Sequence, residues 1–244
     1  MITTTQKLKR SFDRKVSNAV SPNGKRATIA NTFGLPAGKD YSCPGATSIC
    51  ESVCYAGKLE KLFKGVKINL LHNWELLKDA DHDTMEALLM DMIADFKQDC
   101  EKKEAPKLFR IHWDGDFFND EYAFAWKHVI LNHPDIQFWV YTRVKSAAVM
   151  LKDIPNLSLY YSTDSENKEI GVNLKKDHGI RLAYLAKNFA LGQADMKELT
   201  SKPGAKCPEN LKSIPLISQK GSACVSCGLC VYNKADIVFS ASKK

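Results

Sequence analysis

Apolar residues along this chain follow two periods, one typical of strands and one typical of helices. Short runs rich in apolar and β-branched residues predict strands at residues 26–33, 107–113, 136–142, 157–163, 180–186 and 213–217. Apolar residues at helical spacing predict helices at residues 58–79, 83–102, 120–131 and 146–153. Asp83 suits the N-cap of the second helix, and Pro134 ends the third. Strands that alternate with helices indicate a parallel sheet with crossover helices.

The length of the chain limits which α/β architecture it can form. A closed eight-fold barrel takes about 250 residues before any additional segment, and this chain has 244. We therefore expect an α/β fold in the form of a partial or irregular βα barrel of about six parallel strands. An open doubly wound sheet is the second expectation. The predicted parts are a flexible basic arm (1–25), the barrel core with an N-terminal cysteine loop (26–200) and a cysteine-rich C-terminal segment (201–244).

Basic residues gather at the start of the chain. Residues 1–30 hold seven Lys and Arg against one acid, and the whole chain carries a net charge of +7. Such an arm could follow the phosphates of a nucleic acid or an acidic partner, or it could be a solvated tail. No apolar run approaches the roughly 18 residues of a membrane helix, and the start lacks the apolar stretch of a secretory signal. These features predict a cytoplasmic protein with no membrane partner.

Four cysteines near the C-terminus form the most specific motif. Cys224, Cys227 and Cys230 have the spacing C-x2-C-x2-C, and Cys207 is followed by Pro208. Three closely spaced thiolates and a distant Cys-Pro favour a 4Fe–4S cluster. A zinc site is the alternative, although zinc more often uses two separated C-x2-C pairs. Eight cysteines without a secretory signal indicate a reducing compartment and metal binding rather than disulfides.

A second cysteine group lies earlier in the chain. Cys43, Cys50 and Cys54 have the spacing C-x6-C-x3-C. Three thiolates leave one position of a four-ligand cluster open to a substrate or cofactor. Cys100 is left over, and its place near the end of a helical pattern predicts a packing residue.

Polar residues follow several predicted strands at the same end. Asp114, Gly115 and Asp116 come after 107–113, Thr142 and Arg143 come after the apolar run 136–140, Asp164 comes after 157–163, and the two cysteine groups come after the first and last strands. Because the carboxyl ends of parallel strands converge, these residues predict one shared site.

The residue types of this predicted site suggest several roles. Asp114 and Asp116 could bind an amino group, ligate a metal or act in acid–base chemistry. Gly115 lets the backbone turn tightly or approach a ligand. Arg143 could hold a carboxylate or phosphate, or pair with one of the two aspartates. We predict His112 to be a core histidine, and none of the other histidines is predicted as a ligand.

Residues 31–57, 110–126 and 138–143, together with the closing cysteines, resemble the phage "gene product 88-like" family. That resemblance implies a phage origin and an iron–sulfur cluster. More distantly, the layout is similar to that of radical S-adenosylmethionine (SAM) enzymes. This likeness implies that Cys43, Cys50 and Cys54 hold a SAM-binding cluster and that Asp114, Gly115 and Asp116 contact the SAM amino group. It further implies an auxiliary cluster on the C-terminal cysteines. The cysteine spacing differs from the usual C-x3-C-x2-C of those enzymes, and the acidic motif differs from their Gly-Gly-Glu.

The function that we expect is that of a radical-SAM-like redox enzyme. It would use one or two 4Fe–4S clusters, SAM, an electron donor and a small-molecule substrate, in the host cytoplasm if a phage encodes it. Three alternatives stay open. The chain could be an electron carrier or redox sensor with one cluster and no SAM chemistry, or seven cysteines could share one irregular site. It could also be a zinc-stabilised module that binds nucleic acid or a host protein.

Overall fold

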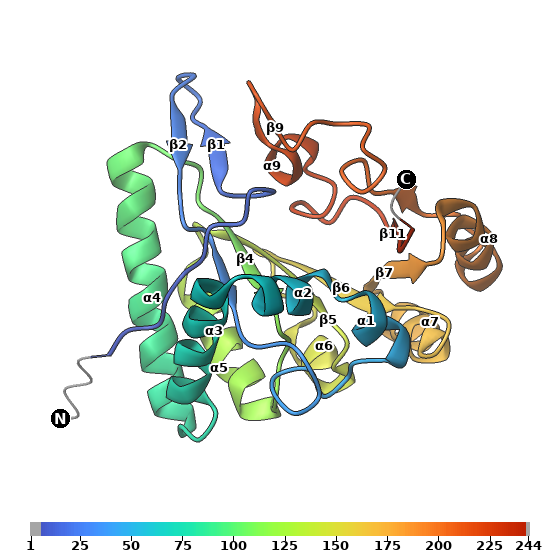
Figure 1. Ribbon diagram of the computed structural model, residues 1–244, viewed down its shortest axis with the longest axis horizontal. Coiled ribbons are helices and arrows are strands. Elements are labelled where there is room, and N and C mark those ends of the chain that lie inside the picture. The colour runs from blue at the N-terminus through green and yellow to red at the C-terminus, as the bar shows by residue number, and fades with distance from the viewer. Residues whose placement is uncertain (1–5, 243–244) are drawn as a thin grey trace.

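A parallel sheet forms the centre of the molecule, of which the computed structural model describes residues 6–242 (Figure 1). In these residues the sheet has seven strands in the order β3-β4-β5-β6-β7-β11-β8, and every paired neighbour is parallel. The strands are β3 (Thr32–Gly34), β4 (Leu108–Asp114), β5 (Gln137–Thr142), β6 (Leu157–Thr163), β7 (Arg181–Ala186), β11 (Ile237–Ser240) and β8 (Ala205–Lys206). The predicted α/β class and parallel sheet are therefore confirmed.

Helices connect the strands in sequence. Four of them lie between β3 and β4, namely α1 (Ser48–Val53), α2 (Tyr55–Leu62), α3 (Lys64–Leu77) and α4 (His82–Lys103). One helix follows each of the next four strands: α5 (Asp120–Asn132), α6 (Lys145–Leu151), α7 (Lys168–His178) and α8 (Phe189–Thr200). None of the described helices combines the length and the hydrophobicity needed to cross a bilayer.

Three details of these elements differ from the sequence prediction. The helix predicted over 58–79 is divided at Phe63, whose backbone is extended. The strand predicted over 26–33 is divided into β2 (Arg26–Thr28) and β3. Asp81 caps α4 in place of Asp83, because its carboxylate accepts a hydrogen bond from the Thr84 N–H at 2.9 Å.

The larger core lies between the sheet and the helices α4–α8. Alternate residues of β5 face opposite sides, as a strand period of two requires. Phe138 and Val140 belong to the helix-covered core, whereas Trp139 packs on the other face. His112 is buried on the helix side with Nε2 2.9 Å from the Tyr122 hydroxyl, as predicted for a core histidine. Cys100 on α4 is likewise buried in this core.

The other face of the sheet is covered by segments from both ends of the chain. Val16 and Val231 pack on Leu108 and Trp139, and Ile237 packs on this face further along the sheet. The strand predicted at 213–217 is wrong, because only Ile217–Ser218 is extended, as β9, and it pairs with β10 (Gly221–Ser222) outside the main sheet. The C-terminal cysteines therefore lie across a face of the sheet: Cys207 directly follows the sheet strand β8, whereas the other three follow β10 outside the main sheet.

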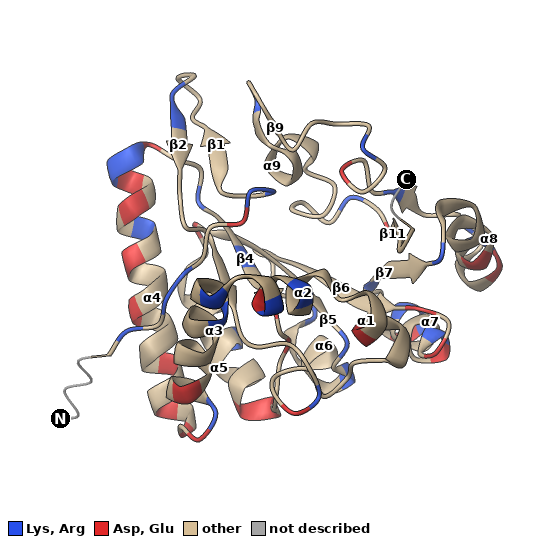
Figure 2. Cartoon of the chain, viewed as in Figure 1, with Lys and Arg blue, Asp and Glu red and all other residues tan. Residues whose placement is uncertain are grey.

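The segment predicted as a flexible basic arm makes specific contacts where it is described. Within residues 6–25, β1 (Asn18–Val20) pairs with β2, and Leu8 and Val16 are buried. The segment runs beside α4, which carries mainly acidic residues along its length and basic residues toward its C-terminal end (Figure 2). Arg10 Nη2 lies 2.6 Å from Asp99 Oδ2, and Lys7 Nζ lies 3.0 Å from Asp95 Oδ2. Residues 1–5 of that prediction, and residues 243–244 of the predicted C-terminal segment, lie outside the described residues.

Candidate metal centres

The carboxyl ends of β4, β5 and β6 meet at one edge of the sheet, and the Asp116 carboxylate links the end of β4 to the end of β5. Its Oδ1 accepts a hydrogen bond from Thr142 Oγ1 at 2.6 Å, and its Oδ2 accepts one from the Arg143 N–H at 2.7 Å. Burial raises the pKa of Asp116 to about 6, although these hydrogen bonds act in the opposite direction. Both carboxylate oxygens are thus engaged by the protein itself.

Arg143 pairs with Asp164, not with either aspartate of the Asp-Gly-Asp turn. Arg143 Nη1 lies 2.8 Å from Asp164 Oδ2, and both side chains are buried. The same oxygen accepts a hydrogen bond from Thr47 Oγ1 at 2.6 Å. Thr47 is also the N-cap of α1, where its hydroxyl accepts a hydrogen bond from the Cys50 N–H. One hydroxyl therefore connects the end of β6 to the cysteine loop, a role that the sequence pattern did not reveal.

Cys43, Cys50 and Cys54, the N-terminal cysteine group, lie at this same edge as free thiols of intermediate exposure. Cys43 precedes α1, Cys50 lies on α1, and Cys54 joins α1 to α2, where its Sγ accepts a hydrogen bond from the Gly57 N–H at 3.3 Å. Burial raises the pKa of all three thiols. The nearby charge of Asp116 adds to this effect on Cys43, whereas the Arg143 guanidinium opposes it on Cys50. The fold thus brings this group together with the residues that follow β4 and β5.

Asp114 is a buried acidic side chain at this edge, and one of its oxygens has no hydrogen-bond partner among the described residues. Its Oδ1 accepts a hydrogen bond from the Gly115 N–H at 2.9 Å, but its buried Oδ2 has no hydrogen-bond partner among the described residues. Burial and the neighbouring Glu60 carboxylate raise the pKa of Asp114 to about 9. Asp114 is also one of the neighbouring groups that raise the pKa of the Cys43 and Cys54 thiols, so this carboxyl lies near the N-terminal cysteine group. A buried acceptor without a donor is a place where a ligand amino group would be stabilised.

Gly115 is needed where the chain turns into this site. Its φ is +81°, and a Cβ at this position would lie 2.4 Å from Ser42 Oγ and 2.8 Å from the Leu35 carbonyl oxygen. The backbone that leads to Cys43 therefore packs directly on the end of β4, and a side chain at position 115 would separate them.

Cys207, Cys224, Cys227 and Cys230, the C-terminal cysteine group, line a single cavity. Cys224 and Cys227 lie on α9 (Ala223–Cys227), and Cys207 follows β8. Backbone hydrogen bonds fix this segment to distant parts of the chain: the Cys224 N–H donates to Lys15 O at 2.9 Å, and the Cys207 N–H donates to Val238 O at 3.0 Å. Burial raises the pKa of Cys224 and of Cys230 to about 12. All four predicted ligands are therefore brought to one place.

Arginine and tyrosine side chains lie between the two cysteine groups. Arg110, in the middle of β4, pairs with Asp13 at 3.0 Å and covers the Tyr141 ring at 5.6 Å from its centroid. Cys230 and Cys224 act with burial to raise the pKa of Tyr141, so this tyrosine adjoins the C-terminal group. Tyr55 directly follows Cys54, and its hydroxyl donates to Trp113 O at 3.1 Å. The Arg110 guanidinium is a neighbouring charge of Tyr55, Tyr141 and Cys224, and it thus lies between the two groups.

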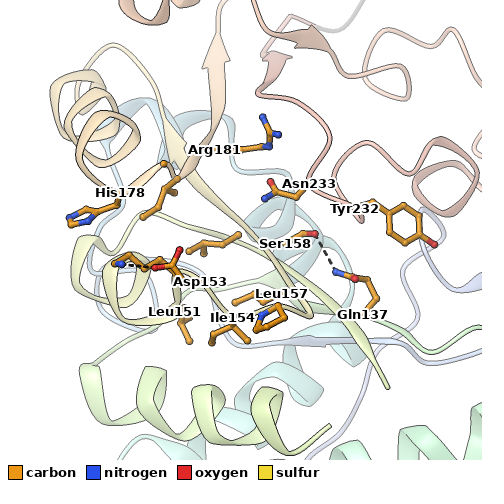
Figure 3. A pocket seen from close by; sticks show the side chains of 15 residues that line it. Gln137, Leu151, Asp153, Ile154, Leu157, Ser158, His178, Arg181, Tyr232 and Asn233 are labelled. Carbon is orange, nitrogen blue, oxygen red and sulfur yellow. Dashed lines mark hydrogen bonds and ion pairs between the residues drawn. The ribbon is translucent and has the colours of Figure 1, made fainter. Parts of the chain in front are cut away.

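A separate cavity of about 400 Å³ opens at the opposite ends of the strands (Figure 3). Gln137, Leu157 and Arg181, the first residues of β5, β6 and β7, line it together with Tyr232 and Asn233. None of the predicted site residues is among its lining residues. Its side chains are of types common on protein surfaces, and their sequence spacing gives no signal of a shared cavity.

These features define an α/β protein in which a parallel sheet carries two separate groups of cysteines, one at a sheet edge and one on a sheet face. The chain belongs to the Gene product 88 family, whose model matches residues 6–233. It is 52% identical to the Gene 88 protein of Mycobacterium phage L5 over 243 residues, which cover 98% of this chain and 99% of that protein. It is 51% identical to the Gene 88 protein of Mycobacterium phage D29 over 243 residues, with 97% and 99% covered. No solved structure matches the chain. The predicted phage family is thus confirmed, whereas the cluster and SAM chemistry stay predictions.

Proposed function

We propose that this chain is an iron–sulfur protein with two clusters. Cys207, Cys224, Cys227 and Cys230 would hold a closed 4Fe–4S cluster, and the N-terminal cysteine group would hold a second cluster with one open iron position. The observation that carries the proposal is that all four C-terminal cysteines line one cavity on the sheet face. Bound clusters would supply one-electron redox chemistry.

The sequence spacing of the C-terminal cysteines favours a cluster over a single zinc ion. Three thiolates at C-x2-C-x2-C with a distant Cys-Pro are typical of 4Fe–4S ligation, whereas zinc sites more often use two separated C-x2-C pairs.

The open cluster would bind SAM or a related cationic small molecule. Asp114 supports this part of the proposal, because its buried Oδ2 lacks a hydrogen-bond partner among the described residues and Asp114 is a close enough neighbour of Cys54 to affect the pKa of that thiol. A ligand amino group would supply that donor.

The consecutive order of strands β3 to β7, with helices on one side, also suits the partial barrel that we propose for this sheet.

The residues between the cysteine groups would connect the two clusters electronically. Arg110 lies between them and contacts the Tyr141 ring, which in turn adjoins Cys230. In this proposal Arg110 and Tyr141 would lie between the two groups of thiolates that hold the clusters, and the bound clusters would supply one-electron chemistry to an external electron donor and to a substrate. We place the protein in the reducing cytoplasm of the host, where its free thiols would stay reduced.

The iron content of protein purified without oxygen tests the proposal. Two 4Fe–4S clusters predict about eight irons per chain, and loss of either cluster leaves about four. Cys227→Ala should abolish the C-terminal cluster and Cys54→Ala the N-terminal one. Cys100→Ala is the matched control, because Cys100 is a buried packing residue of α4 and should leave the iron content unchanged. Iron-free protein that contains zinc would refute the proposal.

A product assay tests the SAM chemistry separately. With SAM and dithionite, the loaded protein should form 5′-deoxyadenosine, and Asp114→Asn should reduce this activity more than it reduces the iron content. Protein that keeps both clusters, forms no 5′-deoxyadenosine and shows no spectral change with SAM would refute SAM chemistry alone.

A second candidate function is that of an electron carrier with only the C-terminal cluster. One observation favours it: Arg143 is paired with Asp164 inside the protein, and it is therefore not free to hold the carboxylate of a ligand. This candidate predicts about four irons per chain. It also predicts that Cys54→Ala leaves the cluster spectrum unchanged.

A further inference from the structure

His82, Glu86 and His128 form a cluster on the outer helices, away from both cysteine groups. His82 and Glu86 lie one turn apart at the start of α4, and His128 lies on α5, which packs against α4. Both helices lie on the side of the sheet opposite to the C-terminal cysteine segment (Figure 1). One ligand atom from each of His82, Glu86 and His128 lies within 4.8 Å of the other two. Sequence patterns did not predict this cluster, because 46 positions separate the two histidines.

The geometry of the cluster resembles a three-ligand metal site. A single oxygen, Glu86 Oε2, lies 3.2 Å from His82 Nε2 and 2.7 Å from His128 Nδ1. With metal–ligand bonds of about 2.0–2.1 Å, tetrahedral geometry places ligand atoms about 3.3 Å apart. The first distance already fits, and the second would need to widen by about 0.6 Å, which a side-chain rotation can supply.

Packing holds the two imidazole rings in place. The Phe124 ring contacts both of them, with centroid distances of 5.1 Å to His82 and 4.3 Å to His128. The imidazole planes are inclined at 85° to one another, and their centroids are 5.4 Å apart. The other nitrogen of His82, Nδ1, is buried without a hydrogen-bond partner among the described residues. The rings are therefore preorganised, which lowers the conformational cost of binding an ion.

Two imidazoles and one carboxylate are a ligand set that suits zinc and related divalent ions, and they leave a fourth position for water. The three side chains are between a quarter and about a third exposed, so an ion can reach them from solvent. If no ion binds, the cluster is a pair of partly exposed His–Glu contacts, which contribute little to stability.

We propose that His82, Glu86 and His128 bind one divalent transition-metal ion of the zinc class and that this ion connects α4 to α5. This site does not depend on the proposed clusters, because it uses nitrogen and oxygen ligands only.

Calorimetric titration with Zn²⁺ tests the site. The protein is purified without oxygen, so that any cluster bound by the cysteine groups stays in place. After treatment with EDTA, the chain should bind Zn²⁺ with a component that His128→Ala weakens at least tenfold. His82→Gln provides a second variant at the exposed start of α4, in case His128→Ala does not fold. His133→Ala is the control, because His133 caps the end of the same α5 and contacts only Val129 O through its ring.

Imidazole resonances then distinguish this site from zinc bound by cysteines. In long-range ¹H–¹⁵N spectra, Zn²⁺ should shift the His82 and His128 nitrogens and leave those of His133 in place. X-ray absorption of the bound zinc should show nitrogen and oxygen neighbours without sulfur. The proposal would be overturned if His128→Ala and His82→Gln both bound Zn²⁺ as strongly as the unsubstituted protein, or if Zn²⁺ shifted no imidazole resonance.

Discussion

Replacing Gly115 with alanine should separate the N-terminal cysteine loop from the end of β4. Two effects act at this position. Its φ of +81° lies in the left-handed region, where an L-residue costs about 1–2 kcal/mol. The new Cβ would also lie 2.8 Å from the Leu35 carbonyl oxygen, 2.9 Å from Leu35 Cβ and 2.4 Å from Ser42 Oγ.

The steric effect is the larger one, because the neighbours cannot easily move. The Ser42 hydroxyl donates to Pro36 O at 2.7 Å and accepts from the Asp116 N–H at 3.3 Å, so its rotation would break both hydrogen bonds. The Leu35 carbonyl oxygen is part of the backbone. Overpacking of this kind costs about 1–3 kcal/mol, and the two effects together should lower the free energy of unfolding by about 2–5 kcal/mol.

Gly24→Ala is the matched control. Gly24 has a similar φ of +76°, but nothing lies within 4 Å of the position that its Cβ would occupy. It should therefore cost only the conformational penalty of about 1–2 kcal/mol. Urea unfolding of both variants measures the difference, and iron analysis shows whether Gly115→Ala loses only the iron that the proposed N-terminal cluster would contribute. Equal destabilisation by the two substitutions would show that the loop does not depend on close packing at Gly115.

Three further predictions concern single residues of the site and the core. Burial lowers the pKa of His112 from 6.5 to about 3. As the pH decreases from about 6.5 to 3, His112 is therefore protonated in the unfolded chain before it is protonated in the folded one, and the free energy of unfolding falls. His112→Asn should remove about 2 kcal/mol of that loss at pH 5, and equal acid sensitivity of the variant and the unsubstituted protein in urea unfolding would contradict this. Arg143→Met leaves the fully buried Asp164 without its partner and should cost about 3–5 kcal/mol, much of which a second substitution, Asp164→Asn, should restore in thermal unfolding. Thr47→Val removes both the cap of α1 and a hydrogen bond to Asp164. It should lower the free energy of unfolding by about 1–2 kcal/mol and reduce only the iron of the proposed N-terminal cluster, and an unchanged iron content would argue against this link.

The sequence predicts best the strands that are buried on both faces. The strand predicted at 157–163 matches β6 residue for residue, because six of its seven residues are buried and four of them are leucine or tyrosine. The helix α7 has no comparable signal, since only Gly171 and Leu174 of its eleven residues are buried. The strand β11 was missed because it has four residues and follows an irregular cysteine-rich segment.

Candidate ligands could be predicted from spacing, but their partners could not. The C-x2-C-x2-C motif is local, and residues from Cys224 to Cys230 need only a short helix and a turn to face one cavity. The pairing of Arg143 with Asp164 depends instead on which strand lies beside β5, and this is a property of the sheet order. The meeting of His82 with His128 similarly depends on how α4 packs on α5. Such contacts are set by tertiary packing, which local periodicity does not encode.

The C-terminal segment illustrates why metal binding and folding would be linked here. Between β8 and β11 the chain forms only two-residue strands and the five-residue helix α9. Its buried apolar contacts come from few side chains, among them Ala223 and Val231. Such a segment gains little from its own hydrogen bonds and packing, so ligation by four thiolates would supply a large share of its stability. Because this segment covers Trp139 and Tyr160 on the sheet face, loss of the metal centre should expose these two aromatic side chains, and Trp139 fluorescence would then report the integrity of the site.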